Sequence, residues 1–87
     1  MFQKGLGEVV ISAGASVHVD DAAAWGLLNR HSNGDWGSVS ASTAKENDYY
    51  CEHLGEVLSQ YEVAGQKIWI ITDEGHETTT VLLPEDY

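Results

Sequence analysis

The C-terminal part of the chain alternates apolar and polar positions with a period of two. The alternation is explicit in residues 57–63, and two further segments that favour strands, 67–73 and 78–83, follow it. The intervening segments 64–66 and 74–76 each contain a glycine and favour turns. Alternating segments joined by short glycine-containing turns are typical of β-hairpins. The pattern therefore predicts a three-stranded antiparallel meander.

The middle segment of this meander differs from its neighbours. Ile68-Trp69-Ile70-Ile71 is apolar at consecutive positions. A strand that is buried on both faces shows such a continuous run. We therefore expect residues 67–73 to form the central strand, with helices on one face of the sheet. A partner subunit on the other face remains an open alternative.

The N-terminal part predicts two short extended segments. Val9-Val10-Ile11 is a β-branched run bounded by turn-forming residues, which favours an edge strand of about five residues. The segment from Ser16 to Val19 alternates valines with polar neighbours. It is predicted to be a second short extended piece.

A first helix is predicted after these strands. Asp20 and Asp21 supply an N-cap and a negative first turn. The pair Asn33-Gly34 can adopt the left-handed conformation that closes a helix, so we expect the helix to run to about Arg30. Trp25 lies on the apolar stripe of this helix and is assigned to the core.

A second helix is predicted from a capping box. Thr43-Ala44-Lys45-Glu46 has the spacing at which the threonine and glutamate side chains satisfy each other's free backbone amides. The segment from Gly37 to Thr43 is rich in Ser, Gly and Ala and is interpreted as a loop. The helix is expected to cover about Ala44 to Leu54 and to end at Gly55.

These elements define an α+β fold. We expect an antiparallel sheet of three to four strands, composed of the C-terminal meander plus the N-terminal edge strand, with two helices packed on one face. The chain has 87 residues. Two separate cores would each be too small to offset the chain entropy, so residues 1–87 are predicted to form a single domain.

The charge balance restricts the class of partner. The chain contains 14 Asp and Glu against 4 Lys and Arg, which gives a formal net charge of −10. Binding to DNA or RNA requires clustered cations that displace condensed counterions, and the cations here are scattered. Direct nucleic-acid binding is therefore not expected. An acidic surface attracts proteins with a basic surface; the alternative is that the acidity serves only solubility.

Compartment and membrane relation follow from composition. Cys51 is the only cysteine, which excludes an internal disulfide and favours a reducing compartment. No stretch approaches the roughly 18 apolar residues that are needed to span a bilayer. We therefore expect a cytoplasmic protein without membrane insertion.

Few side chains are candidates for chemistry. A metal site needs three or four converging ligands, and the near pairs in sequence are His31 with Asp35 and Cys51 with His53. Positions 51 and 53 point to different sides of a helix, so Cys51 is interpreted as a small buried hydrophobe. His31 is interpreted as a helix-terminal histidine that bonds to the turn beyond it. Phosphate-loop, dinucleotide, zinc-protease, redox and nucleophile-elbow motifs do not occur. We therefore predict no catalytic residue, metal or cofactor, and no enzymatic activity.

The segment from His31 to Gly37 has two interpretations. As a structural connector, it would use Gly34 and Gly37 for unusual backbone angles, Asp35 to bond the backbone and Trp36 to fill the core. As a binding loop, it would expose Asp35 and Trp36 as an acidic and aromatic anchor for a partner.

Spaced blocks in roughly the last two-thirds of the chain resemble those of a known group of proteins. The blocks are His31, Gly34-Asp35-Trp36-Gly37, Asn47, Lys67-Ile68-Trp69-Ile70-Ile71-Thr72 and Thr79-Thr80-Val81-Leu82-Leu83-Pro84-Glu85 with Tyr87. They are similar to those of a family of small bacterial proteins encoded on plasmids, integrated elements and phages and described only as plasmid-related or hypothetical. The resemblance implies a mobile-element context and no catalytic residue.

The leading functional hypothesis combines this context with the charge. We expect a non-enzymatic binding protein that inhibits a host defence complex, such as a CRISPR surveillance complex or a restriction enzyme, by mimicking DNA or blocking a surface. One alternative is a small metal-binding protein or enzyme that uses His31 and Asp35. Another is a structural plasmid protein that forms a homodimer or larger oligomer through its sheet. The predicted partner-binding residues are Asp35, Trp36, Asp73, Glu74, Glu85 and Asp86.

Overall fold

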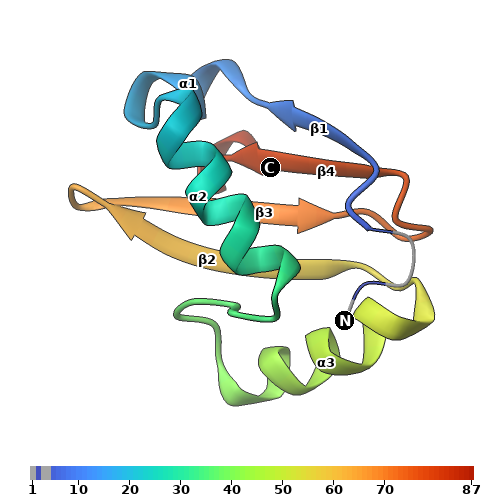
Figure 1. The fold of residues 1–87 in the computed structure, drawn as a ribbon. Helices are drawn as coiled ribbons and strands as arrows, with labels where there is room; N and C mark the ends of the chain where they lie inside the picture. Colours follow the sequence, from blue (N-terminus) through green and yellow to red (C-terminus); the bar gives the residue numbers. More distant parts are fainter. Residues whose placement is uncertain (1, 3–4) are drawn as a thin grey trace.

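The computed structural model describes residue 2 and residues 5–87, which form an α+β fold (Figure 1). The elements in chain order are β1 (Glu8–Ile11), α1 (Ala13–His18), α2 (Asp21–Ser32), α3 (Ala41–His53), β2 (Val57–Val63), β3 (Gln66–Thr72), β4 (Thr78–Leu82) and a 3₁₀ turn, η1 (Pro84–Asp86). The fold class expected from the sequence is confirmed.

The sheet has four strands in the order β1-β4-β3-β2. β2, β3 and β4 form the predicted antiparallel meander, in which Ser59 lies opposite Ile70 and Ile70 opposite Val81. β3 is an inner strand and β1 an edge strand, as predicted. β1 pairs with β4 in parallel, which makes the sheet mixed. Three helices separate β1 from the meander, so the chain is long enough to bring β1 alongside β4 in either direction.

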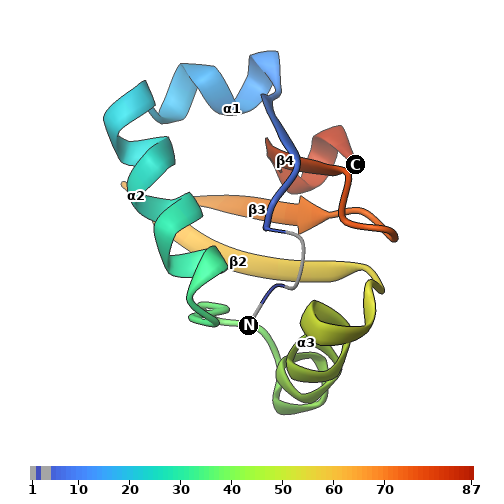
Figure 2. The same ribbon diagram turned by 45° about the vertical axis from the view of Figure 1, so that its right-hand side comes forward.

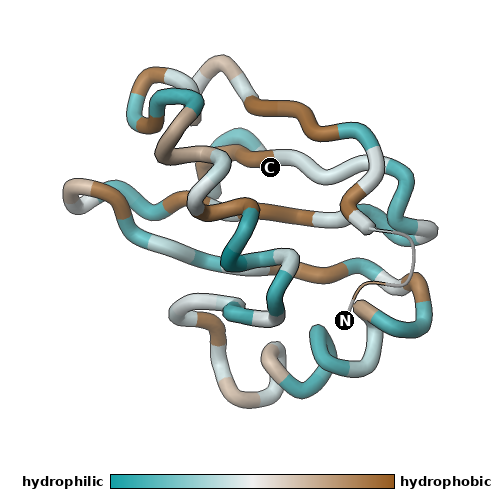
Figure 3. The backbone as a smooth tube through the Cα atoms, viewed as in Figure 1, coloured by the Kyte–Doolittle hydropathy of each residue, from teal (hydrophilic) through white to brown (hydrophobic). Residues whose placement is uncertain are grey.

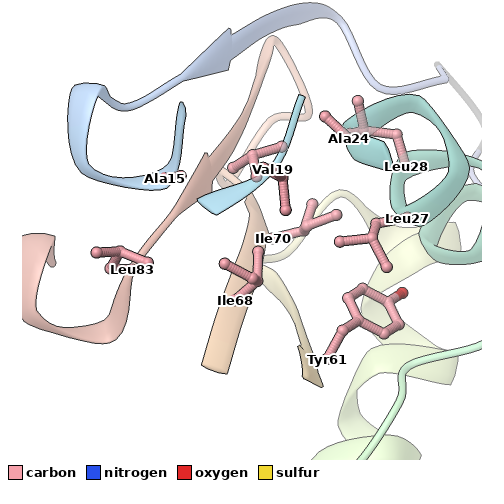
Figure 4. Packing of buried hydrophobic residues seen from close by; sticks show 10 residues of the cluster. Ala15, Val19, Ala24, Leu27, Leu28, Tyr61, Ile68, Ile70 and Leu83 are labelled. Atoms are coloured by element: carbon pink, nitrogen blue, oxygen red, sulfur yellow. The ribbon is translucent and has the colours of Figure 1, made fainter. Parts of the chain in front are cut away.

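The two main helices pack on the sheet from different positions. α2 crosses one face, and α3 lies along the outer side of β2 (Figures 1 and 2). The most hydrophobic stretches of the backbone are β1 and the middle of β3 (Figure 3). Leu27 and Leu28 of α2 point towards Ile68, Ile70 and Tyr61 of the sheet and form the main core with them (Figure 4).

The segment that was predicted to be extended between Ser16 and Val19 is largely helical, so that prediction was wrong. α1 begins after Ser12, whose side chain accepts a hydrogen bond from Ala15 N. This cap stabilises a short helix, which outweighs the preference of the β-branched residues at 17 and 19 for a strand. Only Val19, at the C-cap, has extended backbone angles.

Trp25 does not lie in the core, contrary to the sequence prediction. Its side chain is 59% exposed. The buried face of α2 consists of Ala24, Leu27, Leu28 and His31, which follow the i, i+3, i+4, i+7 spacing. Trp25 lies one residue, or about 100°, away from Ala24 around the helix axis. The sheet therefore selects the neighbouring stripe of α2.

α3 begins earlier than the capping box predicted. Its N-cap is Ser40, whose hydroxyl accepts a hydrogen bond from Thr43 N at 3.2 Å. The predicted cap at Thr43 was therefore wrong, because Ser40 supplies the same chemistry one turn upstream. α2, in contrast, has the predicted N-cap Asp20. It runs to Ser32, two residues beyond the expected Arg30, and its C-cap is Asn33 of the predicted Asn33-Gly34 pair.

The outer edge of β2 is closed by groups from outside the sheet. The Asn47 side-chain amide donates to Leu58 O at 2.7 Å, and its carbonyl oxygen accepts from Leu58 N at 3.1 Å. Farther along, Gln60 N donates to Trp36 O and Gln60 O accepts from Ser38 N. These contacts satisfy backbone groups that a strand edge otherwise leaves open.

Replacing Asn47 by alanine is expected to lower the free energy of unfolding by about 2 to 3 kcal/mol. The variant leaves the amide and carbonyl of Leu58 without their partners at a part-buried position. Urea unfolding followed by circular dichroism measures the effect. Lys45→Ala, an exposed change on the same helix, is the matched control and should shift stability by no more than about 0.5 kcal/mol. Equal midpoints for the two variants would show that Asn47 does not support the edge.

Candidate functional site

The carboxylates form the most extensive charged surface of the described residues. All 14 Asp and Glu residues lie in the described part of the chain, and every one is exposed. The described cations, Arg30, Lys45 and Lys67, are also exposed but lie on separate elements. The acidity is therefore a property of the surface and not of a buried cluster.

One group of carboxylates surrounds a hollow beside α3. Gly75 N donates to Leu54 O at 2.7 Å, which holds the β3–β4 turn against the end of α3. A surface hollow of about 480 Å³ results, lined by Glu46, Tyr50, Gly55, Glu56 and Glu74. We call these residues, with Tyr49 and the adjacent Asp73, the α3 acidic face. Among the described residues, no lysine or arginine lines this hollow.

Two exposed tyrosines give the α3 acidic face a fixed aromatic part. Tyr49 and Tyr50 are 58% and 40% exposed. Tyr49 stacks on His53 with ring centroids 4.0 Å apart, and Tyr50 meets Tyr49 edge-on. A Cβ at Gly55 would lie 2.2 Å from the Tyr50 ring, so the absence of a side chain there lets the ring pack against the backbone. Tyrosines held in this way supply contact area for a partner with little loss of side-chain entropy.

The predicted partner-binding residues do not converge on one site. Asp73 and Glu74 lie on the α3 acidic face. Asp35 lines a different hollow together with Lys67, at the start of β3. β3 has seven residues, so about 20 Å of strand separates that hollow from the β3–β4 turn.

The two C-terminal acids lie on η1, after β4. Glu85 is exposed there. Asp86 accepts hydrogen bonds from Ser12 Oγ at 3.0 Å and from Leu83 N at 3.3 Å, and so joins the two ends of the described chain. Asp86 therefore has a structural role.

Asp35 is held by a neighbouring cation. Its carboxylate accepts from Arg30 Nε at 2.7 Å and from Gly37 N at 3.2 Å, the latter as the predicted bond to the backbone. The Arg30 hydrogen bond lowers the pKa of Asp35, and the same bond raises the pKa of Arg30. The Arg30 guanidinium also lies 4.6 Å above the Tyr61 ring. The negative charge of Asp35 is thus largely neutralised by Arg30, which weakens its attraction for a basic partner.

Trp36 fills the core and is not an exposed anchor, so the connector interpretation of this residue is confirmed and the anchor interpretation is wrong. It is 6% exposed and packs with Cys51 and Val57. Its Nε1 donates to Asp48 Oδ1 at 3.0 Å. Cys51 is buried as predicted, and burial raises the pKa of its thiol.

His31 lies at the centre of a buried polar network. Nδ1 is 2.6 Å from Ser59 Oγ, and Nε2 is 2.9 Å from Thr72 Oγ1. Thr72 Oγ1 lies 2.8 Å from Thr79 Oγ1, which donates to Leu6 O. The His31 side chain thus bonds to the sheet. The prediction that it bonds to the turn beyond the helix was wrong.

The direction of each hydrogen bond in this network follows from the Leu6 carbonyl at its end. Leu6 O can only accept, so Thr79 donates to it and Thr72 donates to Thr79. His31 Nε2 then donates to Thr72, and Nδ1 accepts from Ser59. Desolvation lowers the pKa of His31 to about 4, with a smaller contribution from the nearby His76. His31 is therefore a neutral imidazole with both ring nitrogens bonded.

The pairing of Ser59 and His31 does not make a site for nucleophilic catalysis. A hydroxyl bonded to an imidazole has the geometry of a nucleophile and its base. Both residues, however, are 0% exposed, so a substrate does not reach them. Asp35 is exposed and bonds Arg30 on the surface, whereas His31 is fully buried and bonds Ser59 and Thr72, so the two side chains share no partner.

Neither a metal cluster nor a membrane span occurs in the described residues. No three His, Cys, Asp or Glu side chains among residues 2 and 5–87 gather in a way that could hold a metal ion. Within the same residues, no helix has the length and apolar character that crossing a bilayer requires.

The sequence analysis missed Glu46, Tyr49, Tyr50 and Glu56. A signal existed for two of them, since Glu46 and Tyr50 are four residues apart and thus share one side of a helix. Nothing in the sequence indicated that Glu74 would join them, because the β3–β4 turn reaches α3 only in the folded chain.

Comparison with known proteins adds no relative. The chain matches no family, no curated protein and no solved structure.

Proposed function

We propose that this protein is a non-enzymatic acidic binding protein that inhibits a nucleic-acid-binding complex by occupying its basic surface. The observation that carries the proposal is the α3 acidic face, where Glu46, Glu56 and Glu74 surround one hollow beside Tyr50. A hollow lined by carboxylates and an aromatic ring suits the insertion of an arginine or lysine side chain. Basic surfaces of this kind bind phosphates in DNA- and RNA-binding proteins.

The net charge supports the same partner. A formal charge of −10 on a body of 32 × 26 × 21 Å produces a strong negative field, which accelerates association with a positive surface. The resemblance of its spaced blocks to plasmid- and phage-borne proteins supports a host defence complex, of the CRISPR or restriction type, as the target. Inhibition would then take place in the cytoplasm.

A charge-reversal experiment tests this function. Purified CRISPR surveillance complexes and restriction enzymes are titrated with the protein, and DNA binding by each is followed by fluorescence anisotropy. We expect one of these complexes to lose DNA binding, with an effect that weakens as salt is raised. The variant Glu46→Lys/Glu56→Lys/Glu74→Lys should bind that complex at least about tenfold more weakly.

The matched control reverses three exposed carboxylates elsewhere. Glu8→Lys/Glu62→Lys/Glu85→Lys changes the net charge by the same amount and should retain most of the inhibition. Equal loss in both variants would show that net charge, and not the α3 acidic face, is responsible. If no complex in the panel is inhibited, the proposed function is wrong.

A further inference from the structure

The two edges of the sheet are treated differently by the fold. Asn47, Trp36 and Ser38 close the outer edge of β2, as described above. At the other edge, Glu8 N donates to Glu77 O and Ser12 N donates to Val81 O, both in the direction of β4. Because strand residues alternate in direction, the amide and carbonyl groups of Val9 and Ile11 point away from the sheet.

The outward groups of Val9 and Ile11 have no partner within residues 2 and 5–87. β1 is nevertheless apolar, as its colour in Figure 3 shows, and Val10 is 42% exposed. An open, apolar strand edge is a template for pairing with another extended chain. At the β2 edge the fold thus covers the outward backbone groups of Leu58 and Gln60, whereas both outward positions of β1 stay open in the described part of the chain.

A hollow with three apolar lining residues lies between α2 and the segment that leads into β1. It has a volume of about 210 Å³ and is lined by Leu6, Trp25, Leu28, Asn29 and Ser32. Leu6 is two residues before β1, and the other four belong to α2, so the hollow lies between α2 and the start of β1. The exposed Trp25 forms one wall of this hollow and is therefore available to contact a partner's side chain.

We infer that β1 accepts an extended segment of a partner protein as a fifth strand, with one large apolar side chain seated in the hollow between α2 and β1. An edge strand beside a helix suits this mode, in which main-chain hydrogen bonds give affinity and pockets for alternate side chains give specificity. Glu8 and Glu77 are exposed at the start of the edge, and no described lysine or arginine lies on β1 or on the β3–β4 turn. The partner segment that pairs with β1 should therefore carry lysine or arginine residues next to its large apolar residue.

The occupant is a different protein and not a second copy of this chain. Pairing two β1 strands would bring together two molecules that each carry a net charge of −10. This site is independent of the α3 acidic face, because β1 and α3 lie at opposite edges of the sheet (Figure 1).

A defined peptide tests the inference. The probe is the blocked peptide KTLKLTK, whose two leucines lie on one side of an extended chain and whose central lysine lies on the other. Titration of the labelled full-length protein by NMR should shift the amides of Val9, Val10 and Ile11 and the indole of Trp25. The same peptide with N-methyl groups on alternate residues, on the side that pairs with β1, should bind about tenfold more weakly or worse because it loses main-chain donors.

Two protein variants separate strand addition from charge attraction. Trp25→Ala removes a wall of the hollow and should weaken peptide binding severalfold, whereas Tyr87→Ala, which changes an exposed aromatic residue outside both proposed sites, should not. Equal binding of the methylated peptide, or shifts confined to α3, would overturn the inference, as would the absence of binding at millimolar peptide. Light scattering that shows a dimer which the peptide does not dissociate would assign the edge to a second copy and would also overturn it.

Discussion

Replacing His31 by alanine is expected to lower the free energy of unfolding by about 4 kcal/mol. The change leaves a cavity under α2 and removes the partner of Ser59 Oγ and of Thr72 Oγ1, all in a region with no exposure to water. Small domains have a total stability of only about 5 kcal/mol or somewhat more. The variant should therefore retain only about 1 kcal/mol, with up to roughly 15% of its molecules unfolded at room temperature and a much lower urea midpoint, which urea titration monitored by tryptophan fluorescence will show.

A compensated variant separates the polar network from the volume of the ring. His31→Leu alone should be strongly destabilised, because the buried Ser59 hydroxyl loses its acceptor and the buried Thr72 oxygen loses its donor. In His31→Leu/Ser59→Ala/Thr72→Val these hydroxyls are also removed, and replacing both sides of a buried hydrogen bond by apolar groups is much less costly. The triple variant should therefore recover about 2 kcal/mol relative to His31→Leu. Equal stability of the two would show that the hydrogen bonds contribute little.

The elements of this fold were predictable where a local signal decides them. Alternation and glycine turns specify the meander, and a continuous apolar run marks β3 as an inner strand. The cap at Asp20 and the left-handed Gly34 set the limits of α2. Each of these signals acts within a few residues, so it can be read without knowing the rest of the fold.

The wrong predictions concern positions where the local sequence allows two structures and contacts with distant segments decide between them. Trp25 is exposed because the sheet contacts one stripe of α2 and not its neighbour, whereas Trp36, which follows α2, is buried against Cys51 and Val57. Ser40 and Thr43 are both competent caps, and the path of the loop from Trp36 selects the first. The pairing of β1 with β4 joins segments about seventy residues apart, which no local pattern reveals.

The candidate site shows the same division. Surface acidity followed directly from composition, and Asp73 and Glu74 were among the predicted partner-binding residues. Their grouping with Glu46 and Glu56 depends on the contact of Gly75 with Leu54, which forms only on folding. His31 was recognised as unusual, but its partners in β2 and β3 are 28 and 41 residues away, so a role at the helix end was the nearer interpretation.

Stability is expected to fall as the pH is lowered from about 6.5 to about 4, by about 3 kcal/mol in total. In the folded protein, desolvation holds the pKa of His31 at about 4, so the ring stays neutral through this range. In the unfolded chain His31 has its ordinary pKa of 6.5 and takes up a proton. The unfolded state therefore binds more protons between these values, and acid favours it. Above about pH 6.5 neutral His31 contributes fully to the free energy of unfolding, and below about pH 4 its contribution falls no further.

The contribution of His31 can be separated from that of the acids. The hydrogen bond from Arg30 lowers the pKa of Asp35 below its ordinary value of 3.8, so Asp35 acts below the His31 range. Urea unfolding at several pH values should give a steeper loss for the parent protein than for His31→Leu/Ser59→Ala/Thr72→Val, with a difference of about 3 kcal/mol across the range. NMR titration of the His31 ring in the folded parent gives the same quantity directly. A pKa above 6 for that ring would contradict the argument, because a ring that charges so readily cannot be held neutral by Ser59, Thr72 and the surrounding core.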